Sequence, residues 1–299
     1  VSYTFNASEP GTYLYHSGTN PELQIEMGLT GAIVVRPVGF DPGADASRLA
    51  YNHPSTWYHH EYLFFLTEMD HRVHEQVEFG QMAQIDNTTW FPYYWFINGR
   101  NAPDTMSAAF SQDLPHQPYN CVPRAHPGER VLIRVVGAGR DMHPFHHHGN
   151  HSTLIARDGR LVAQDPGSGP DLATKYFTIP TWPGSTYDTI WDPWTGYGLG
   201  WDVMPNQPVQ DWEDPRYTDI PLPVELPADL DLTFGAFYSG SPYLGSMGSL
   251  PPGNPGFNAN GGYAFMWHSH NEKELTSNDI YPGGMFTMMI VEPPGVPIE

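Results

Sequence analysis

The sequence predicts an all-β protein, and three observations lead to that prediction. Glycine (30) and proline (31) together make up about a fifth of the 299 residues, a proportion typical of short strands joined by turns. Aromatic residues supply another 14% and fit the same profile. No segment carries a sustained apolar repeat of 3.6 residues with caps at both ends, so we expect helices to be short and few.

Five runs of β-forming residues are the predicted strands. Their apolar residues either alternate with polar ones or form a continuous stretch, as expected for the strands of a sandwich. In chain order, these runs are residues 31–36, 61–66, 130–136, 152–155 and 284–291.

The chain length suits two domains, since domains usually run to roughly 100 to 200 residues. We place the boundary near residue 90, where the turn signal Asp86-Asn-Thr-Thr89 gives way to an aromatic run, residues 90–100, that enters a new strand. Residues 1–90 then form one unit and residues 91–299 another. A stretch rich in proline, glycine and aspartate, at about 192–262, is interpreted as long loops or an insertion.

Composition excludes some partners. Acidic residues outnumber basic ones by 33 to 13, giving a net charge of −20 that repels a phosphate backbone and argues against nucleic acid. The same charge solvates the surface and can steer a cationic partner. No apolar run approaches the roughly 20 residues of a membrane span. The single cysteine, Cys121, permits no internal disulfide and is expected to be a buried, inert thiol.

The histidines suggest a metal site. Fifteen are present, and the informative ones are His16, the run from His143 to His151, and the pair in Trp267-His-Ser-His270. Residues two apart on a strand point the same way, so His146 can converge with His148, and His268 with His270. Imidazole binds copper, zinc, iron or nickel. Two His-x-His pairs in separate β segments are hard to explain by packing.

The remaining histidines have a simpler interpretation as satisfied core or surface residues. His53, His116 and His126 are set aside on that ground. Four others stay open between structure and function: His59, His60, His71 and His74.

Three segments together resemble the multicopper oxidase family, including its laccases. Residues 11–18 (Gly-Thr-Tyr-Leu-Tyr-His-Ser-Gly) resemble the family's Gly-Thr-x-x-Tyr-His-Ser-His. Residues 143–149 (His-Pro-Phe-His-His-His-Gly) match its His-Pro-x-His-x-His-Gly, and residues 267–270 resemble the segment around its His-Cys-His. The resemblance implies cupredoxin-like Greek-key β-sandwich domains. Residues 1–90 would be the C-terminal part of a first such domain, incomplete at its N-terminus.

The family pattern implies copper as the cofactor and assigns roles residue by residue. His16, His148, His268 and His270 fall at ligand positions of the type 3 coppers, and His146 at a type 2 position. His143 falls at the blue-copper position. In the family, electrons enter at the blue copper, pass through its cysteine, and reduce dioxygen at the trinuclear cluster.

The sequence departs from that pattern at several ligands. Ser269 stands where the thiolate of a blue-copper site should be, and a hydroxyl cannot replace that soft ligand. Glu274 stands where the family has a second histidine, and Met285 lies farther downstream than the usual axial residue. Gly18 replaces the second histidine of His-Ser-His. We therefore expect no blue copper and an incomplete cluster.

The resemblance also implies a partner, because a half sandwich leaves strand edges uncovered. The partner would be an N-terminal polypeptide or a neighbouring subunit, so we expect a homo-oligomer or a complex. A true N-terminus upstream of Val1 is expected, since the chain opens with neither a signal peptide nor a start methionine. The family context implies a secreted, periplasmic or extracellular location.

Three functions remain open from the sequence. The first is a divergent copper oxidoreductase without blue copper, supplied with electrons by a redox protein partner. The second is a non-catalytic structural or binding protein with a vestigial metal site. The third is a metal-dependent hydrolase or lyase in which Glu272, Glu274 or Asp141 serves as general base.

Overall fold

The computed structural model describes residues 2–126, 128–149, 151–191, 263–292 and 295–298. The stretch predicted as loops or an insertion, 192–262, lies outside these residues. The strands are β1 (Gly11–His16), β2 (Thr30–Val35), β3 (His60–Met69), β4 (Tyr94–Ile97), β5 (Arg124–Ala125), β6 (Val131–Gly137), β7 (His143–His147), β8 (Ser152–Arg157), β9 (Arg160–Leu161), β10 (Thr174–Tyr176), β11 (Thr178–Thr181), β12 (Thr186–Trp191), β13 (Tyr263–Ser269) and β14 (Phe286–Val291).

Helices in the described residues are short, as predicted. The two α-helices are α1 (Pro21–Gln24) and α2 (His71–Glu78). The 3-10 turns are η1 (Asp45–Ser47), η2 (Pro54–Thr56), η3 (Met82–Gln84), η4 (Asn87–Thr89), η5 (Asp104–Met106) and η6 (Glu272–Leu275). None of the described helices has the length and apolar character needed to cross a bilayer.

The strands form three sheets, which confirms the predicted all-β sandwich. A seven-stranded sheet runs in the order β10-β8-β12-β6-β3-β4, with β9 paired to β8, and a five-stranded sheet runs β11-β7-β13-β14-β5. β1 and β2 form a separate two-stranded hairpin. Most neighbours are antiparallel, but β3 pairs with β6, and β14 with β5, in parallel. All five predicted strand runs fall on strands of these sheets.

The main core lies between the two large sheets. The ring of Phe64, on β3, lies 5.2 Å from that of Phe145 on β7 and 5.6 Å from that of Trp267 on β13. Val131, Ile133 and Val135 face the same core from alternate positions of β6. The predicted inert thiol, Cys121, is buried here.

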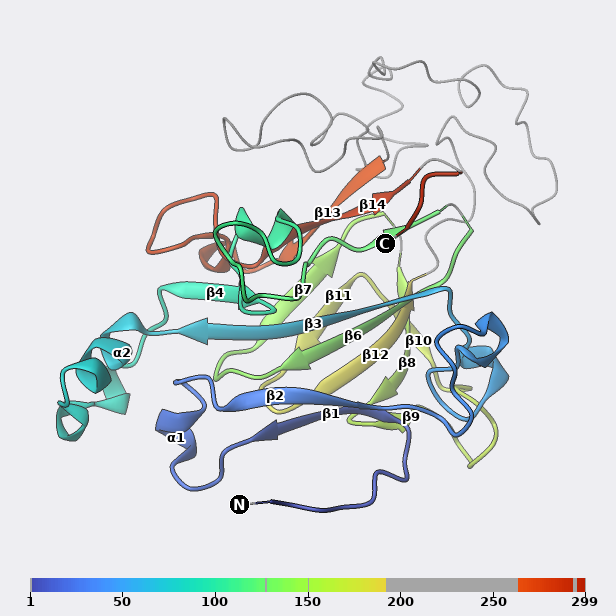
Figure 1. The fold of residues 1–299 in the computed structure, drawn as a ribbon, viewed down its shortest axis with the longest axis horizontal. Helices are drawn as coiled ribbons and strands as arrows, with labels where there is room; N and C mark the ends of the chain where they lie inside the picture. Colours follow the sequence, from blue (N-terminus) through green and yellow to red (C-terminus); the bar gives the residue numbers. More distant parts are fainter. Residues whose placement is uncertain (1, 127, 150, 192–262, 293–294, 299) are drawn as a thin grey trace, which may run out of the picture.

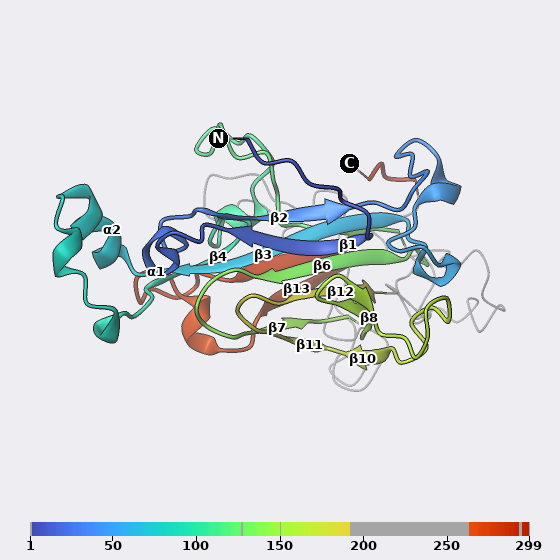
Figure 2. The ribbon, with the colours of Figure 1, turned by 90° about the horizontal axis from the view of Figure 1, so that it is seen from below.

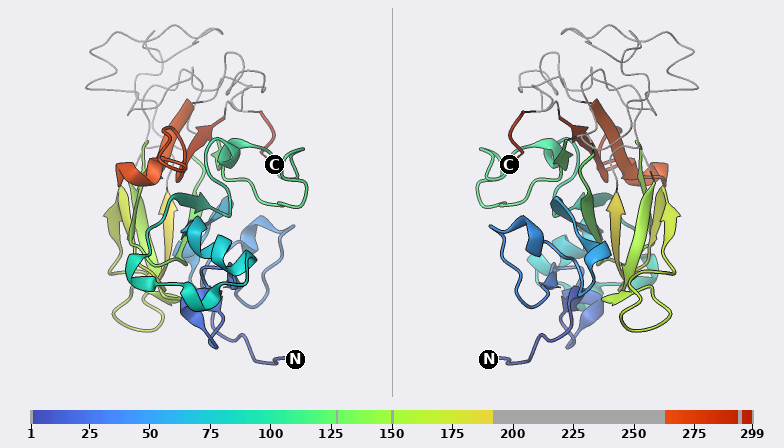
Figure 3. Two further views of the ribbon diagram at one scale, coloured as in Figure 1. Left: turned by 90° about the vertical axis from the view of Figure 1, so that its left-hand side faces the viewer. Right: turned by 90° about the vertical axis from the view of Figure 1, so that its right-hand side faces the viewer.

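The hairpin packs on the opposite face of the seven-stranded sheet. Arg134 alternates with the core-facing residues of β6, and its Nη1 donates to Thr12 of β1 (2.8 Å) and to Asp188 of β12 (3.1 Å). Figure 1 shows the hairpin on one side of this sheet and β13 and β14 on the other. Figure 2 shows the hairpin running alongside β3 and β6, and Figure 3 places the N-terminus on the hairpin side. The described residues therefore form three layers.

The expected domain boundary near residue 90 lies in the connection between β3 and β4. These two strands pair within one sheet, with Leu66 opposite Ile97. The division of the chain into domains remains a prediction.

Candidate metal centre

Two neighbouring strands of the five-stranded sheet place the histidines of the candidate site. β7 and β13 are antiparallel, and their register sets His146 directly opposite His268. His148 lies two residues beyond His146, and His270 lies two residues beyond His268. Side chains two apart on extended backbone point to the same face, so all four rings project from one face of the sheet.

Ring nitrogens of three of these residues come close together. Those of His146, His148 and His268 lie within 4.8 Å of one another, the only such group of three or more His, Cys, Asp or Glu side chains in the described residues. The Nε2 atoms of His148 and His268 are 3.3 Å apart. Two nitrogens bound at about 2.0–2.1 Å to one tetrahedral ion would be about 3.3 Å apart. The ring of His270 lies at the edge of the group, centred 5.0 Å from that of His146.

The cluster favours neutral imidazoles. Burial, together with the neighbouring histidines, lowers the pKa of His146 to about 4 and that of His148 to about 4. Burial also lowers the pKa of His268. A neutral ring keeps a lone pair for a metal ion, and metal binding requires that form. The three rings can therefore act as ligands at neutral pH.

Hydrogen bonds fix the orientation of two rings. Nδ1 of His268 donates to the carbonyl of Ser269 (2.6 Å), which leaves Nε2 with the lone pair. Nδ1 of His146 lies 2.8 Å from Oγ1 of Thr178 on β11. Partners of this kind orient metal-binding histidines in known sites.

His143 lies apart from this group, at the start of β7. It is fully buried, with Nδ1 2.9 Å from Oε2 of Glu274 and Nε2 2.9 Å from Oε2 of Glu68. Burial by itself would lower its pKa, but the hydrogen bonds and charges of Glu274 and Glu68 raise the pKa of His143 to about 9. The two carboxylates therefore favour an imidazolium whose two N–H groups are both used, a form that has no lone pair for a metal ion.

The blue-copper positions of the resemblance do meet in space. His143 contacts Glu274, whose carbonyl accepts from the backbone N–H of Met285 (2.8 Å). The carbonyl of Met285 in turn accepts from the backbone N–H of Ser269 (3.0 Å). Both Ser269 and Met285 are fully buried. The donors found there are a hydroxyl, a thioether, an imidazolium and a carboxylate, which do not fit a blue-copper ion.

His16 lies at the end of β1, on an exposed part of the hairpin. Its Nδ1 contacts the carbonyl of Ser17 (2.9 Å). The hairpin and the five-stranded sheet lie on opposite faces of the seven-stranded sheet, so the structure does not bring His16 to the histidines of β7 and β13.

The three carboxylates considered as general bases have different surroundings. Glu274 is buried and held by His143 and by the side-chain amide of Asn271 (3.0 Å), so it is not available as a base. Glu272 is exposed on η6. Burial and the charge of Glu68 raise the pKa of Asp141.

Two residues of this region were not found from the sequence. Thr178 carried no local signal, because its role depends on β11 pairing with β7. Glu68, by contrast, did carry a local sequence signal. It occupies a core-facing position of β3, in register with Phe64 and Leu66, where a charged residue is unusual without a buried partner.

Comparison with solved structures supports the all-β sandwich fold described above. The blue copper oxidase from Nitrosomonas europaea matches with a TM-score of 0.52 and 18% identity, over 97% of this chain and 58% of its own length. The multicopper oxidase mgLAC gives the same four values. This chain thus spans under two thirds of the length of either structure. No family model and no curated protein matches the sequence. At this identity the likeness establishes a cupredoxin-like fold.

Proposed function

We propose that this chain is a copper-binding oxidoreductase of the multicopper-oxidase type that works without a blue copper. The observation that supports this most strongly is the group of three imidazole nitrogens within 4.8 Å of one another, on the fold that copper oxidases use. His146, His148 and His268 would hold copper, with His270 at the edge of the site. Neutral imidazole suits this metal, so the donor set fits.

Copper bound there would supply one-electron redox chemistry toward dioxygen or another small oxidant. The protein's own contribution is to hold the site ready. Thr178 and the Ser269 carbonyl orient two of the rings, and partial burial keeps the rings neutral so that no proton must leave before metal binds.

Electrons would reach the site from outside the chain. Ser269 offers no thiolate, and His143 is protonated between two carboxylates. A redox protein with a basic surface fits the net charge of −20, because complementary charge speeds the encounter between partners.

We further propose that another polypeptide covers the hairpin. In the described residues β1 and β2 pair only with each other, and Tyr15 and Leu29 are each 54% exposed. A second copy, or an additional segment of polypeptide, would cover these edges and could bring a histidine such as His16 to a cluster. The resemblance also predicts a secreted, periplasmic or extracellular location.

Metal content and spectroscopy test the copper proposal. Copper per chain would be measured by mass spectrometry, with electron paramagnetic resonance and absorption spectra of the oxidised protein. We expect bound copper, a Cu(II) resonance and no intense blue absorption. The His146→Ala/His148→Ala variant should lose this copper, whereas His116→Ala, which removes an exposed histidine, should keep it.

Other outcomes identify the alternatives. Failure to bind any metal would contradict the oxidoreductase and leave a structural or binding protein. Selective binding of zinc, which is silent in these spectra, would favour a metal-dependent hydrolase or lyase instead. The mass of the native protein in solution separately tests for a homo-oligomer.

A further inference from the structure

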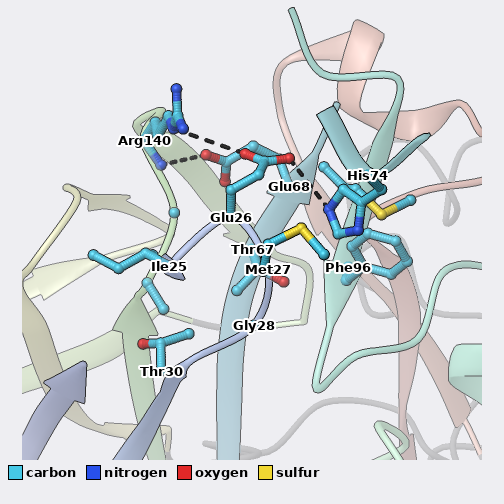
Figure 4. Close-up of a pocket in the computed structure, with 13 residues that line it drawn as sticks. Ile25, Glu26, Met27, Gly28, Thr30, Thr67, Glu68, His74, Phe96 and Arg140 are labelled. Atoms are coloured by element: carbon cyan, nitrogen blue, oxygen red, sulfur yellow. Dashed lines mark hydrogen bonds and ion pairs between the residues drawn. The ribbon is translucent and has the colours of Figure 1, made fainter. Parts of the chain in front are cut away.

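A cavity of about 160 Å³ lies between the hairpin layer and the seven-stranded sheet. Figure 4 shows it, with the segment from Ile25 to Thr30 on one side and Thr67 and Phe96 of the sheet on the other. His74 of α2 also lines it. The cavity and the histidine cluster lie on opposite faces of the seven-stranded sheet, so the two are separate sites.

The imidazole of His74 has an unused nitrogen at this cavity. Its Nε2 is buried and makes no hydrogen bond to any residue that the structure describes. It lies 3.5 Å from Oε1 of Glu26, too far and too poorly aligned for the strong contact that a shared proton would give. A buried nitrogen without a partner is costly unless a ligand uses it. Nε2 is the atom through which this ring would bind a metal ion.

The carboxylate of Glu26 is fixed beside that nitrogen. The Glu26 side chain is 1% exposed. Its Oε1 accepts from the backbone N–H of Asp70 (2.8 Å), and its Oε2 accepts from Nε1 of Trp90 (2.8 Å). Arg140 faces Oε2 at 3.7 Å, so its charge is directed at the oxygen farther from His74. Oε1 therefore presents negative charge on the His74 side of the cavity.

Two methionines are among the residues that line the cavity. Met69 precedes the N-cap Asp70 of α2, and His74 is the fourth residue of that helix. Side chains at these two positions often approach each other at helix N-termini, and Met69 and His74 line the same cavity. In Figure 4 the sulfur of Met27 points toward His74.

We propose that this cavity binds a monovalent copper ion through His74, Met27 and Met69, with Glu26 balancing its charge. Thioether sulfur is a soft ligand that selects Cu(I) over hard cations such as Mg²⁺ and Ca²⁺. A buried carboxylate favours a cation and excludes small anions. Methionines often fill irregular gaps in a core, yet here the cavity that both of them line is far larger than one water molecule.

The test uses silver ion, a redox-inert probe for Cu(I), with protein labelled at the methionine methyl carbons. Leucine variants Met27→Leu and Met69→Leu, which keep the volume and remove the sulfur, assign two of the 11 methionine signals. We expect one equivalent of silver to shift these two signals. Met82→Leu, which changes a methionine that is 54% exposed, is the matched control and should leave binding intact.

Affinity measurements complete the test. Competition with a chromophoric Cu(I) chelator should show binding at least about tenfold weaker in Met27→Leu/Met69→Leu and in His74→Gln, the usual scale for damage to a metal site. The same competition in His146→Ala/His148→Ala separates this site from the histidine cluster. Cu(I) binding at the cavity should be unchanged in that variant. Silver that shifts neither methyl signal, or equal affinity in the double leucine variant, would overturn the proposal.

Discussion

Glu68 and His143 form a buried ion pair that joins the two large sheets, with Oε2 of Glu68 2.9 Å from Nε2 of His143. The second carboxylate, Glu274, contacts the other ring nitrogen from η6. Gly139 leaves room for this arrangement, because a Cβ at that position would overlap the Glu68 carboxylate. Where the resemblance expects a copper ligand, two carboxylates favour a protonated imidazole.

This arrangement predicts a loss of stability at alkaline pH. The unfolded chain releases the proton of His143 near pH 6.5, whereas the folded chain keeps it until about pH 9. The stabilisation is therefore complete below pH 6.5 and is lost as pH rises through 9, by at most about 3 kcal/mol. Urea unfolding measured from pH 6 to 10 tests this.

Glu274→Gln provides the comparison for that measurement. The amide retains a hydrogen-bond acceptor but removes one negative charge, so the pKa of His143 should fall, and the alkaline loss should be complete at lower pH and be smaller. Unfolding free energies that stay constant in the wild type between pH 6.5 and 9 would contradict the assignment of an imidazolium.

Restoring the cysteine alone should not restore blue copper. In Ser269→Cys the carboxylate of Glu274 still holds Nδ1 of His143, so the thiolate would lack its imidazole partners. We expect no intense blue absorption from Ser269→Cys with Cu(II). The double variant Ser269→Cys/Glu274→His removes that carboxylate and adds an imidazole, and should show such absorption. A blue single variant would refute this explanation.

Thr178 should support the proposed copper site without being a ligand. Thr178→Val keeps the shape of the side chain and removes the hydrogen bond to Nδ1 of His146, so we expect copper affinity to fall about 10–100-fold. Competition titration with a chelator measures this. Thr174→Val, an exposed position on β10, is the control. Equal affinities in the two variants would show that Thr178 does not orient the ligand.

Arg134 should be essential for holding the hairpin. Its side chain is fully buried and contacts Glu61, Asp188 and Thr12. Arg134→Leu would leave buried carboxylates without this partner and should cost about 3–5 kcal/mol of unfolding free energy. In Arg134→Leu the rate of amide hydrogen exchange should increase most in β1 and β2. Arg160→Leu, at an exposed position, should have little effect, and a similarly small loss in Arg134→Leu would contradict this role.

Much of the fold could be predicted because its signals are local. All five predicted runs fall on strands, and the two-residue period placed His146 with His148, and His268 with His270, on common faces. The likeness to copper oxidases is confirmed at the level of fold. The boundary expected near residue 90 followed a clear turn signal, but no local pattern reveals that β3 and β4 on either side of it pair.

The sequence by itself determined the strands, the faces on which the histidines lie, and the missing thiolate at Ser269. Only the tertiary structure decided which side chains meet. The β7–β13 register set His146 opposite His268, and the β11–β7 pairing brought Thr178 to His146. His143 has every local mark of a ligand, and its partner Glu68 lies 75 residues away in the chain. Periodicity fixes the direction of each side chain, but the packing of two sheets fixes its partner, and for His143 that partner is a carboxylate that keeps it protonated.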